Sequence, residues 1–439
     1  MKASRERGFR GGRHRQGGAA IVLIVAGMAA LLLMAGLALD GGHMMLNKTR
    51  LQNTVDAAAL AAAKRLDETL GDTTQATPAA LALFGSNAGA AGNNEMQASY
   101  AAGDIQVTVE YSQTLHPFTT GAPAGPYVRV VATGFEMPAW LVQLAGINQK
   151  TVAASAVAGP SPVLDVGVEH CNLAPMMVCG DPGDPDDPDD PDDSVWGYQY
   201  GTPDVLKTSA SGGDTQVGPG NFQLIRLGDG QGGADIRRYM AGDYDACLGG
   251  DGEDVIETEP GNTVGPVVQG LNTRFGDYLG PMGGTQSQYP PDVVTTGQNP
   301  DLTAERNDAT GDDDIFSGSD PVTTETDLDY SYSDYTTDVA NGNFDFPPSP
   351  QGIGVPQRRI VALPVGDCTN TTNGQGQVPL LGYACYFLLQ PVKQKGNEAH
   401  VFGQFIDGCR VNGNQGPAPG TGPGPYRIQL YDDADNADS

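Results

Sequence analysis

The sequence predicts a membrane-anchored α+β protein. An N-terminal transmembrane helix continues into an amphipathic helix, and a small antiparallel sheet and a β-rich, disulfide-containing domain with disordered acidic loops follow. Three observations support this prediction. Residues 17–39 are uncharged and mostly apolar. The 61 glycines and 32 prolines among 439 residues favour turns and short strands over a helical bundle. Alternating apolar and polar residues, typical of half-buried strands, recur after residue 100.

The apolar run is long enough to be a transmembrane helix. As a helix, residues 17–39 measure about 34 Å, and a bilayer core is about 30 Å thick. Six basic residues and one acid precede this run in residues 1–16. The positive-inside rule keeps that flank in the cytoplasm and exports the rest of the chain. A cleaved secretory signal is the alternative, since Gly36-Leu37-Ala38 offers small residues to a peptidase. The run exceeds the roughly 7–15 residues of such signals, so we expect an uncleaved anchor.

The helix after the anchor has one apolar face. Its members recur three or four residues apart, and such residues are neighbours on a helix surface: Leu51, Val55, Ala58, Ala62 and Leu66. We expect this face to pack against partner helices. Small residues inside the anchor, such as Gly27, Ala30 and Gly36, would permit close helix packing as well. Two adjacent glycines within residues 40–43 are expected to kink or loosen the helix where it leaves the membrane.

Residues 40–159 are predicted to form a small α+β domain around this helix. An alanine-rich second helix is expected at residues 78–87 and a short one at 138–146. Three strands are expected from the alternation of apolar residues, at 105–111, 127–133 and 151–158.

Residues 160–415 are predicted to form a β-rich exported domain. Apolar runs predict buried strands at 359–365, 380–389 and 400–406. Residues 181–193 hold eight acids and no base, which predicts an extended, solvated loop.

A second acidic stretch, residues 289–343, has 13 acids and one arginine, Arg306. We expect a flexible insertion there. Residues 416–439 are predicted to be a Gly/Pro linker, a strand at 426–431 and an acidic tail.

All the cysteines lie in the part of the chain that is expected to be exported: Cys171, Cys179, Cys247, Cys368, Cys385 and Cys409. Six thiols in an oxidising compartment predict up to three disulfides. Their pairing is open, because six cysteines allow about 15 connectivities.

Composition argues against several classes of function. The net charge of −29 would repel nucleic acid phosphates. The sequence contains no Gly-x-Ser-x-Gly elbow, HExxH or phosphate-binding loop, so we nominate no catalytic, cofactor or metal residue and do not expect an enzyme. Residues 249–257 match one calcium nonapeptide without neighbouring repeats, and residues 329–333 match a DxSxS metal motif without the buried strand before it. Weak Ca²⁺ binding by the acidic loops is the remaining metal hypothesis.

Three segments resemble a known family. They are the basic Arg13-His-Arg-Gln-Gly-Gly, the end of the apolar run Ala35-Gly-Leu-Ala-Leu-Asp40-Gly, and Leu51-Gln-Asn-Thr-Val-Asp-Ala-Ala-Ala-Leu-Ala-Ala-Ala63. Together they resemble the TadG-like N-terminal segment of Tad (Flp) pilus-assembly proteins, which share a near-identical form of the last segment. The match is best over residues 10–70 and extends more loosely to residue 158. Residues 260–274 and 396–405 look like segments of TadG-related proteins without a von Willebrand A domain.

The resemblance implies a structural or assembly component of a Tad/Flp-type pilus. Such a protein would sit in the bacterial inner (cytoplasmic) membrane, with most of the chain periplasmic or extracellular and with other pilus-assembly proteins as partners. The chain departs from relatives that carry a von Willebrand A domain. It also lacks the glutamate that follows the cleavage glycine of Tad pseudopilins, so prepilin-type processing is not expected. A membrane-anchored surface adhesin or binding protein is the alternative function.

Overall fold

The computed structural model describes residues 19–121, 125–146, 148–161, 170–184, 194–208, 221–228, 232–243, 247–248, 255–307, 313–370, 375–413 and 424–433. The expected acidic loop beyond Asp184 and the nonapeptide up to residue 254 lie outside these ranges. So do the basic flank and the first two residues of the expected anchor.

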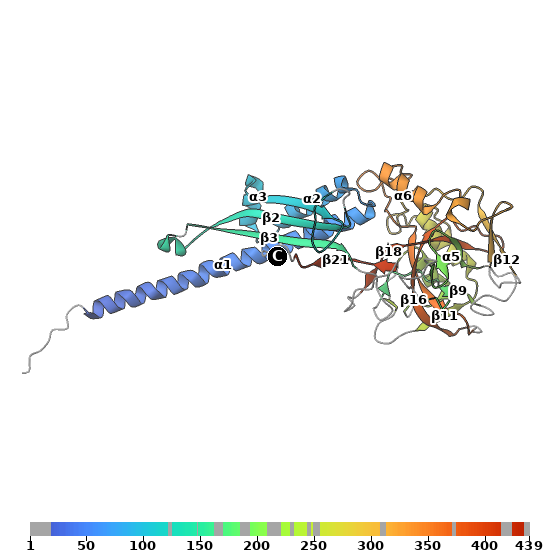
Figure 1. The fold of residues 1–439 in the computed structure, drawn as a ribbon, viewed down its shortest axis with the longest axis horizontal. Helices are drawn as coiled ribbons and strands as arrows, with labels where there is room; N and C mark the ends of the chain where they lie inside the picture. Colours follow the sequence, from blue (N-terminus) through green and yellow to red (C-terminus); the bar gives the residue numbers. More distant parts are fainter. Residues whose placement is uncertain are drawn as a thin grey trace, which may run out of the picture.

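A single helix, α1 (Ala19–Glu68), spans 50 residues and projects from the rest of the molecule (Figure 1). The expected kink at residues 40–43 is absent, because the helix runs unbroken through Gly41 and Gly42. Each glycine costs a helix about 1 kcal/mol relative to alanine. Tertiary contacts on both sides outweigh that cost: Asp40 is bound to a neighbouring hairpin, and Asn47 is buried.

Two short helices and a four-stranded sheet pack along the second half of α1 (Figure 1). Asp72 caps α2, accepting a hydrogen bond from the backbone N–H of Thr74 at 2.9 Å. The sheet is antiparallel in the order β1-β2-β3-β21. The elements are α2 (Thr73–Ala88), α3 (Asn94–Ala102), β1 (Gln106–Ser112), β2 (Tyr127–Pro138), the 3₁₀ turn η1 (Val142–Ala145), β3 (Gln149–Pro160) and β21 (Ile428–Tyr431). We call this unit, from Asp40 to Pro160 with β21, the stalk domain.

The last strand of the stalk domain comes from the far end of the chain. In the antiparallel register Ile428 pairs with Pro160 and Tyr431 with Val157. Asp433 is buried next to Arg129 of β2, with 3.6 Å between their charged atoms. The strand expected at residues 426–431 therefore closes the first sheet, and the acidic tail begins as part of it. Everything between Pro160 and β21, which we call the head, is an insertion between two neighbouring strands.

The head is β-rich, as expected. Its main sheet has seven strands: β5-β15-β16-β11-β9 are neighbours, and β17 joins β16 to β8. These strands are β5 (Val178–Gly180), β8 (Pro203–Lys207), β9 (Asn221–Ile225), β11 (Val255–Pro260), β15 (Ile360–Asp367), β16 (Gln377–Leu388) and β17 (Val401–Ile406). The three apolar runs at residues 359–365, 380–389 and 400–406 thus form β15, β16 and β17, which lie side by side.

Smaller elements surround this sheet (Figure 1). Three helices pack around it: α4 (Gly233–Met240), α5 (Val264–Leu271) and α6 (Tyr332–Asn341). The short strands are β4 (His170–Cys171), β6 (Ser194–Val195), β7 (Tyr198–Gln199), β10 (Cys247–Leu248), β12 (Leu302–Arg306), β13 (Asp313–Ser317), β14 (Asp320–Pro321), β18 (Gly408–Arg410), β19 (Asn412–Gly413) and β20 (Gly424–Tyr426).

Three disulfides brace the head, and they use all six cysteines: Cys171–Cys247, Cys179–Cys368 and Cys385–Cys409. The first joins β4 to β10, which are paired strands, and the second ties β5 to the end of β15. The disulfide expectation is confirmed. The structure also selects one pairing among those that the sequence allowed.

The acidic stretch from residue 289 to 343 is not a flexible insertion where it is described, and that expectation was wrong. It contains β12, β13, β14 and α6, and its core is anchored by a buried aspartate. Asp292 accepts hydrogen bonds from the Tyr335 hydroxyl at 2.9 Å and the Arg359 backbone N–H at 2.8 Å. Arg359 is itself fully buried, and it donates to the backbone carbonyl of Leu388. Composition alone indicated solvent exposure, because it does not show that Asp292 has hydrogen-bond partners inside the head.

Candidate functional site: the anchor helix and its two junctions

The exposed part of α1 is strongly apolar. From Ile21 to Leu39 the large hydrophobic side chains are 55–73% exposed, which is the reverse of a soluble core helix. Within the described residues, α1 is the one helix long and apolar enough to cross a membrane. Exposed aliphatic surface on this scale is stable in lipid and costly in water. The segment suits a single membrane anchor, and the three disulfides of the head fit an exported domain.

The apolar face after the anchor has a different neighbour from the one expected. Leu51, Val55, Ala58 and Ala62 are fully buried and Leu66 is 3% exposed. They pack in one core with α2 and the sheet of the same chain. A helix pattern shows that a face is buried but not by what. In the structure this face is occupied within the chain, so no partner helix can reach it while the stalk domain is folded.

The first junction lies where α1 leaves the apolar run. Asp40 is 1% exposed, and its carboxylate accepts hydrogen bonds from the backbone N–H groups of Trp140, Leu141 and Val142 at 2.7–2.8 Å. Lys150 Nζ lies 3.4 Å from the same carboxylate and donates to the Asp40 carbonyl at 2.8 Å. Burial alone would raise the pKa of Asp40. The three backbone donors and Lys150 outweigh that effect and hold the pKa well below its usual range.

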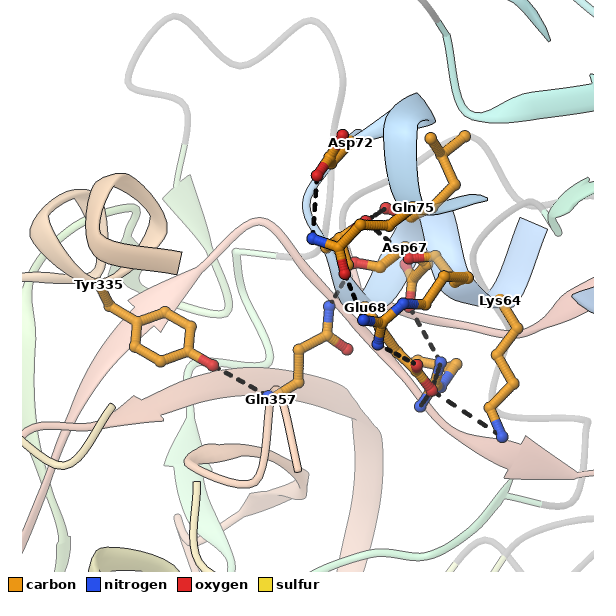
Figure 2. Close-up of polar contacts among 11 residues, drawn as sticks. Lys64, Asp67, Glu68, Asp72, Gln75, Tyr335 and Gln357 are labelled. Carbon is orange, nitrogen blue, oxygen red and sulfur yellow. Dashed lines mark hydrogen bonds and ion pairs between the residues drawn. The ribbon is translucent and has the colours of Figure 1, made fainter. Parts of the chain in front are cut away.

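The second junction joins the end of α1 to the head. Asp67 accepts a hydrogen bond from the Tyr426 hydroxyl at 2.6 Å, and Arg410 lies 3.3 Å from its carboxylate. In Figure 2, Gln357 bridges the two parts: its side chain donates to the Asp67 carbonyl at 2.8 Å, and its backbone N–H donates to the Tyr335 hydroxyl at 2.9 Å. Burial raises the pKa of Asp67, although Tyr426 and Arg410 oppose the rise. One helix therefore connects the apolar anchor to the head through a polar contact.

Two head residues whose side chains could serve as metal ligands, Ser331 and His170, have structural roles. Ser331, in the DxSxS match, is the N-cap of α6 and accepts the backbone N–H of Asp334. His170 is buried edge-on against Tyr383, with 3.8 Å between ring centroids, and burial lowers its pKa to about 4. Among the described residues, no group of three or more His, Cys, Asp and Glu side chains could hold a metal ion.

The contacts of the two junctions could not be predicted from the sequence motifs. Asp40 carried a usable signal, because an acid that directly follows an apolar span needs a local partner. Trp140 carried another, since tryptophan gathers at membrane interfaces. Gln357 and Tyr426 carried none, because their contacts with Asp67 join residues about 300 positions apart.

Comparison with known proteins agrees with this architecture. Residues 17–65 match the family described as Flp pilus-assembly TadE/G-like, and residues 61–158 match the family described as Tad-like Flp pilus-assembly. No curated protein and no solved structure matches the chain. The two family matches overlap at residues 61–65 and together cover α1, α2, α3 and nearly all of the first three strands of the stalk domain. Over residues 17–158 the chain is therefore a TadG-like protein of the Tad/Flp pilus-assembly type.

Proposed function

We propose that this protein is a structural or assembly component of a Tad/Flp-type pilus system, and that it does no chemistry. It acts as a membrane-anchored stalk that presents an exported head. The supporting observation is the continuity of α1, whose exposed apolar half passes without a break into a half buried in the stalk domain. Such a helix holds the head at the membrane surface, which an assembly component requires and a diffusible enzyme does not.

The surface left for partner helices lies within the anchor. Gly27 has open space around it, because an added Cβ would meet no atom within 4 Å. Gly36 does not, since a Cβ there would come within 2.8 Å of the Leu141 side chain. Small residues let membrane helices approach closely. We infer that pilus-assembly partners pack against the Gly27 side of the anchor inside the inner membrane.

The anchor hypothesis is tested in a bacterium that assembles a Tad pilus and lacks its own copy of this chain. The full chain is compared with a version in which a cleaved secretory signal replaces residues 1–39. The released version keeps the head and its disulfides but loses the membrane attachment. We expect pili on the surface with the full chain and none with the released form, scored by electron microscopy. Pili in the absence of any copy, together with lost adherence, would instead support the adhesin alternative.

The partner-helix hypothesis has a matched pair of variants. Gly27→Leu adds a side chain on the proposed contact side, and Ala29→Leu adds one about 200° around the same helix. Both keep the anchor apolar, and both residues are exposed. We expect fewer pili with Gly27→Leu and normal piliation with Ala29→Leu, at equal amounts of membrane-bound protein. Equal piliation in the two variants would refute partner packing at Gly27. It would not affect the conclusion drawn from the anchor experiment.

A further inference from the structure

The hairpin that connects β2 to β3 reaches back along α1 toward the membrane end of the molecule. Its tip, residues 139–146, includes η1 and lies beside the projecting part of α1, away from the head (Figure 1). Leu141 packs directly on Gly36, where even a Cβ atom would collide with it. Gly36 lies in the last turn of the apolar run that ends at Leu39, one turn before Asp40. The tip is therefore level with the end of the membrane span.

The side chains at the tip suit a lipid interface. Trp140 is 48% exposed, and its ring stacks on His43 of α1 with 4.3 Å between centroids. Leu141 and Val142 are half-buried, and residues 139–146 contain no charged side chain. Tryptophan gathers at the boundary between headgroups and acyl chains, where its apolar ring is buried and its N–H stays near polar groups.

Three consecutive backbone donors at the tip are already satisfied. The backbone N–H groups of Trp140, Leu141 and Val142 all donate to Asp40. Lys150 in turn neutralises the Asp40 carboxylate. An unpaired backbone donor in a dehydrated environment costs several kcal/mol, so a loop without such partners would stay in water. This arrangement lowers the cost of moving these three donors out of water.

We propose that the β2–β3 tip is a second membrane contact, docked at the interface of the bilayer that α1 crosses, with Trp140 as its anchor. The occupant of this surface is lipid, at the level of the glycerol groups and upper acyl chains. A single helix leaves a domain free to rotate about the membrane normal and to tilt. A second contact beside it restrains both motions and sets the orientation of the stalk domain, and hence of the head.

The sequence supplies its own probe, because the chain has only two tryptophans, Trp140 and Trp196. The full-length Trp196→Phe variant is reconstituted in phosphatidylcholine–phosphatidylglycerol vesicles whose acyl chains are brominated either near the glycerol or near the methyl end. We expect bromine near the glycerol to reduce the Trp140 emission by about half and bromine at the methyl end to reduce it less, as for an interfacial residue. The control, Trp140→Phe, leaves Trp196 in the head and should be quenched little by either lipid.

One result would overturn the proposal, and a second would overturn the contact with α1 on which it rests. One is quenching of Trp140 no stronger than that of Trp196, which would place the tip in water. The other comes from the Gly36→Leu variant in the Trp196→Phe background. The added side chain should displace the tip and lower the quenching of Trp140 to the control value, while the protein still floats with the vesicles. Unchanged quenching there would mean that the Gly36 contact does not position the tip. If Trp196→Phe misfolds, the difference between the native chain and Trp140→Phe gives the same comparison.

Discussion

Replacing Val55 tests whether the apolar face of α1 belongs to this chain or to a partner. Val55 is 0% exposed and packs in the core between α1, α2 and the sheet. Val55→Ala removes two carbon atoms, worth about 0.8 kcal/mol each, and the cavity left behind brings the loss to about 2–3 kcal/mol. Val55→Asp buries an unpaired carboxylate and costs several kcal/mol more. That is a large fraction of the about 5–15 kcal/mol that stabilises a typical domain.

The assay is thermal unfolding of the full chain in detergent, in the Trp196→Phe background, so that Trp140 reports on the stalk domain. We expect Val55→Ala to lower the midpoint by about 4–12 °C, since each kcal/mol of the expected loss shifts the midpoint by about 2–4 °C. Val55→Asp should leave no folded stalk domain. The control Asn53→Asp adds the same charge two residues away on the exposed side and should change the midpoint little. An unchanged midpoint in Val55→Asp, with pili lost, would show that the face serves a partner.

Three further predictions follow from the topology, the disulfides and a buried acid. A reporter that fluoresces only in the cytoplasm, fused after Ser439, should stay dark, because the basic flank keeps only the N-terminus inside; a bright fusion would reverse the orientation. Peptide mapping without reductant should find the three disulfides given above and no free thiol. In the chain-entropy model, loss of Cys179–Cys368, which spans 189 residues, should cost about 5 kcal/mol of stability. Loss of Cys385–Cys409, which spans 24 residues, should cost about 3.5 kcal/mol. Equal denaturation midpoints for the two variants would contradict this ranking. Burial raises the pKa of Asp204 to about 7 from its ordinary value of 3.8, so between these values the folded state holds a proton that the unfolded state releases. The free energy of unfolding that this proton contributes is fully present below about pH 4 and is lost as the pH rises through 7. Between pH 5 and pH 8 the Asp204→Asn variant should therefore lose less stability than the native chain. Equal losses of stability in the two proteins would contradict this prediction.

Local pattern was enough to predict most secondary structure in the stalk domain. Helical spacing from Leu51 to Leu66 and alternation in residues 105–111 and 127–133 each match an element of the structure. These patterns report the period at which side chains are buried, and helices and strands differ in that period. The resemblance to TadG-like proteins also rests mainly on this helical segment, because relatives share a near-identical form of residues 51–63.

Long-range partners were what the sequence could not show. Asp292 belongs to an acidic stretch whose composition indicated solvent exposure, yet its partner Arg359 lies 67 residues further on and buries it. The C-terminal strand pairs with a strand about 270 residues before it, and a period of two carries no information about which edge it joins. The continuity of α1 across Gly41 and Gly42 is likewise supported by a hairpin 100 residues away.

The insertion of the head between β3 and β21 determines how the protein responds to load. A pull on the head reaches the sheet at Pro160 and at Ile428, which are partners at the same end of the antiparallel pair. Tension applied there separates the two strands one hydrogen-bonded pair at a time. A sheet resists this less than it resists shear, in which all the pairs are loaded together. The bonds between Ser161 and Arg427, and the Tyr426 bond to Asp67 of α1, precede the first rung and must break before it. A load on the head would therefore strain the contacts at the end of α1, around Asp67, before it reaches the sheet.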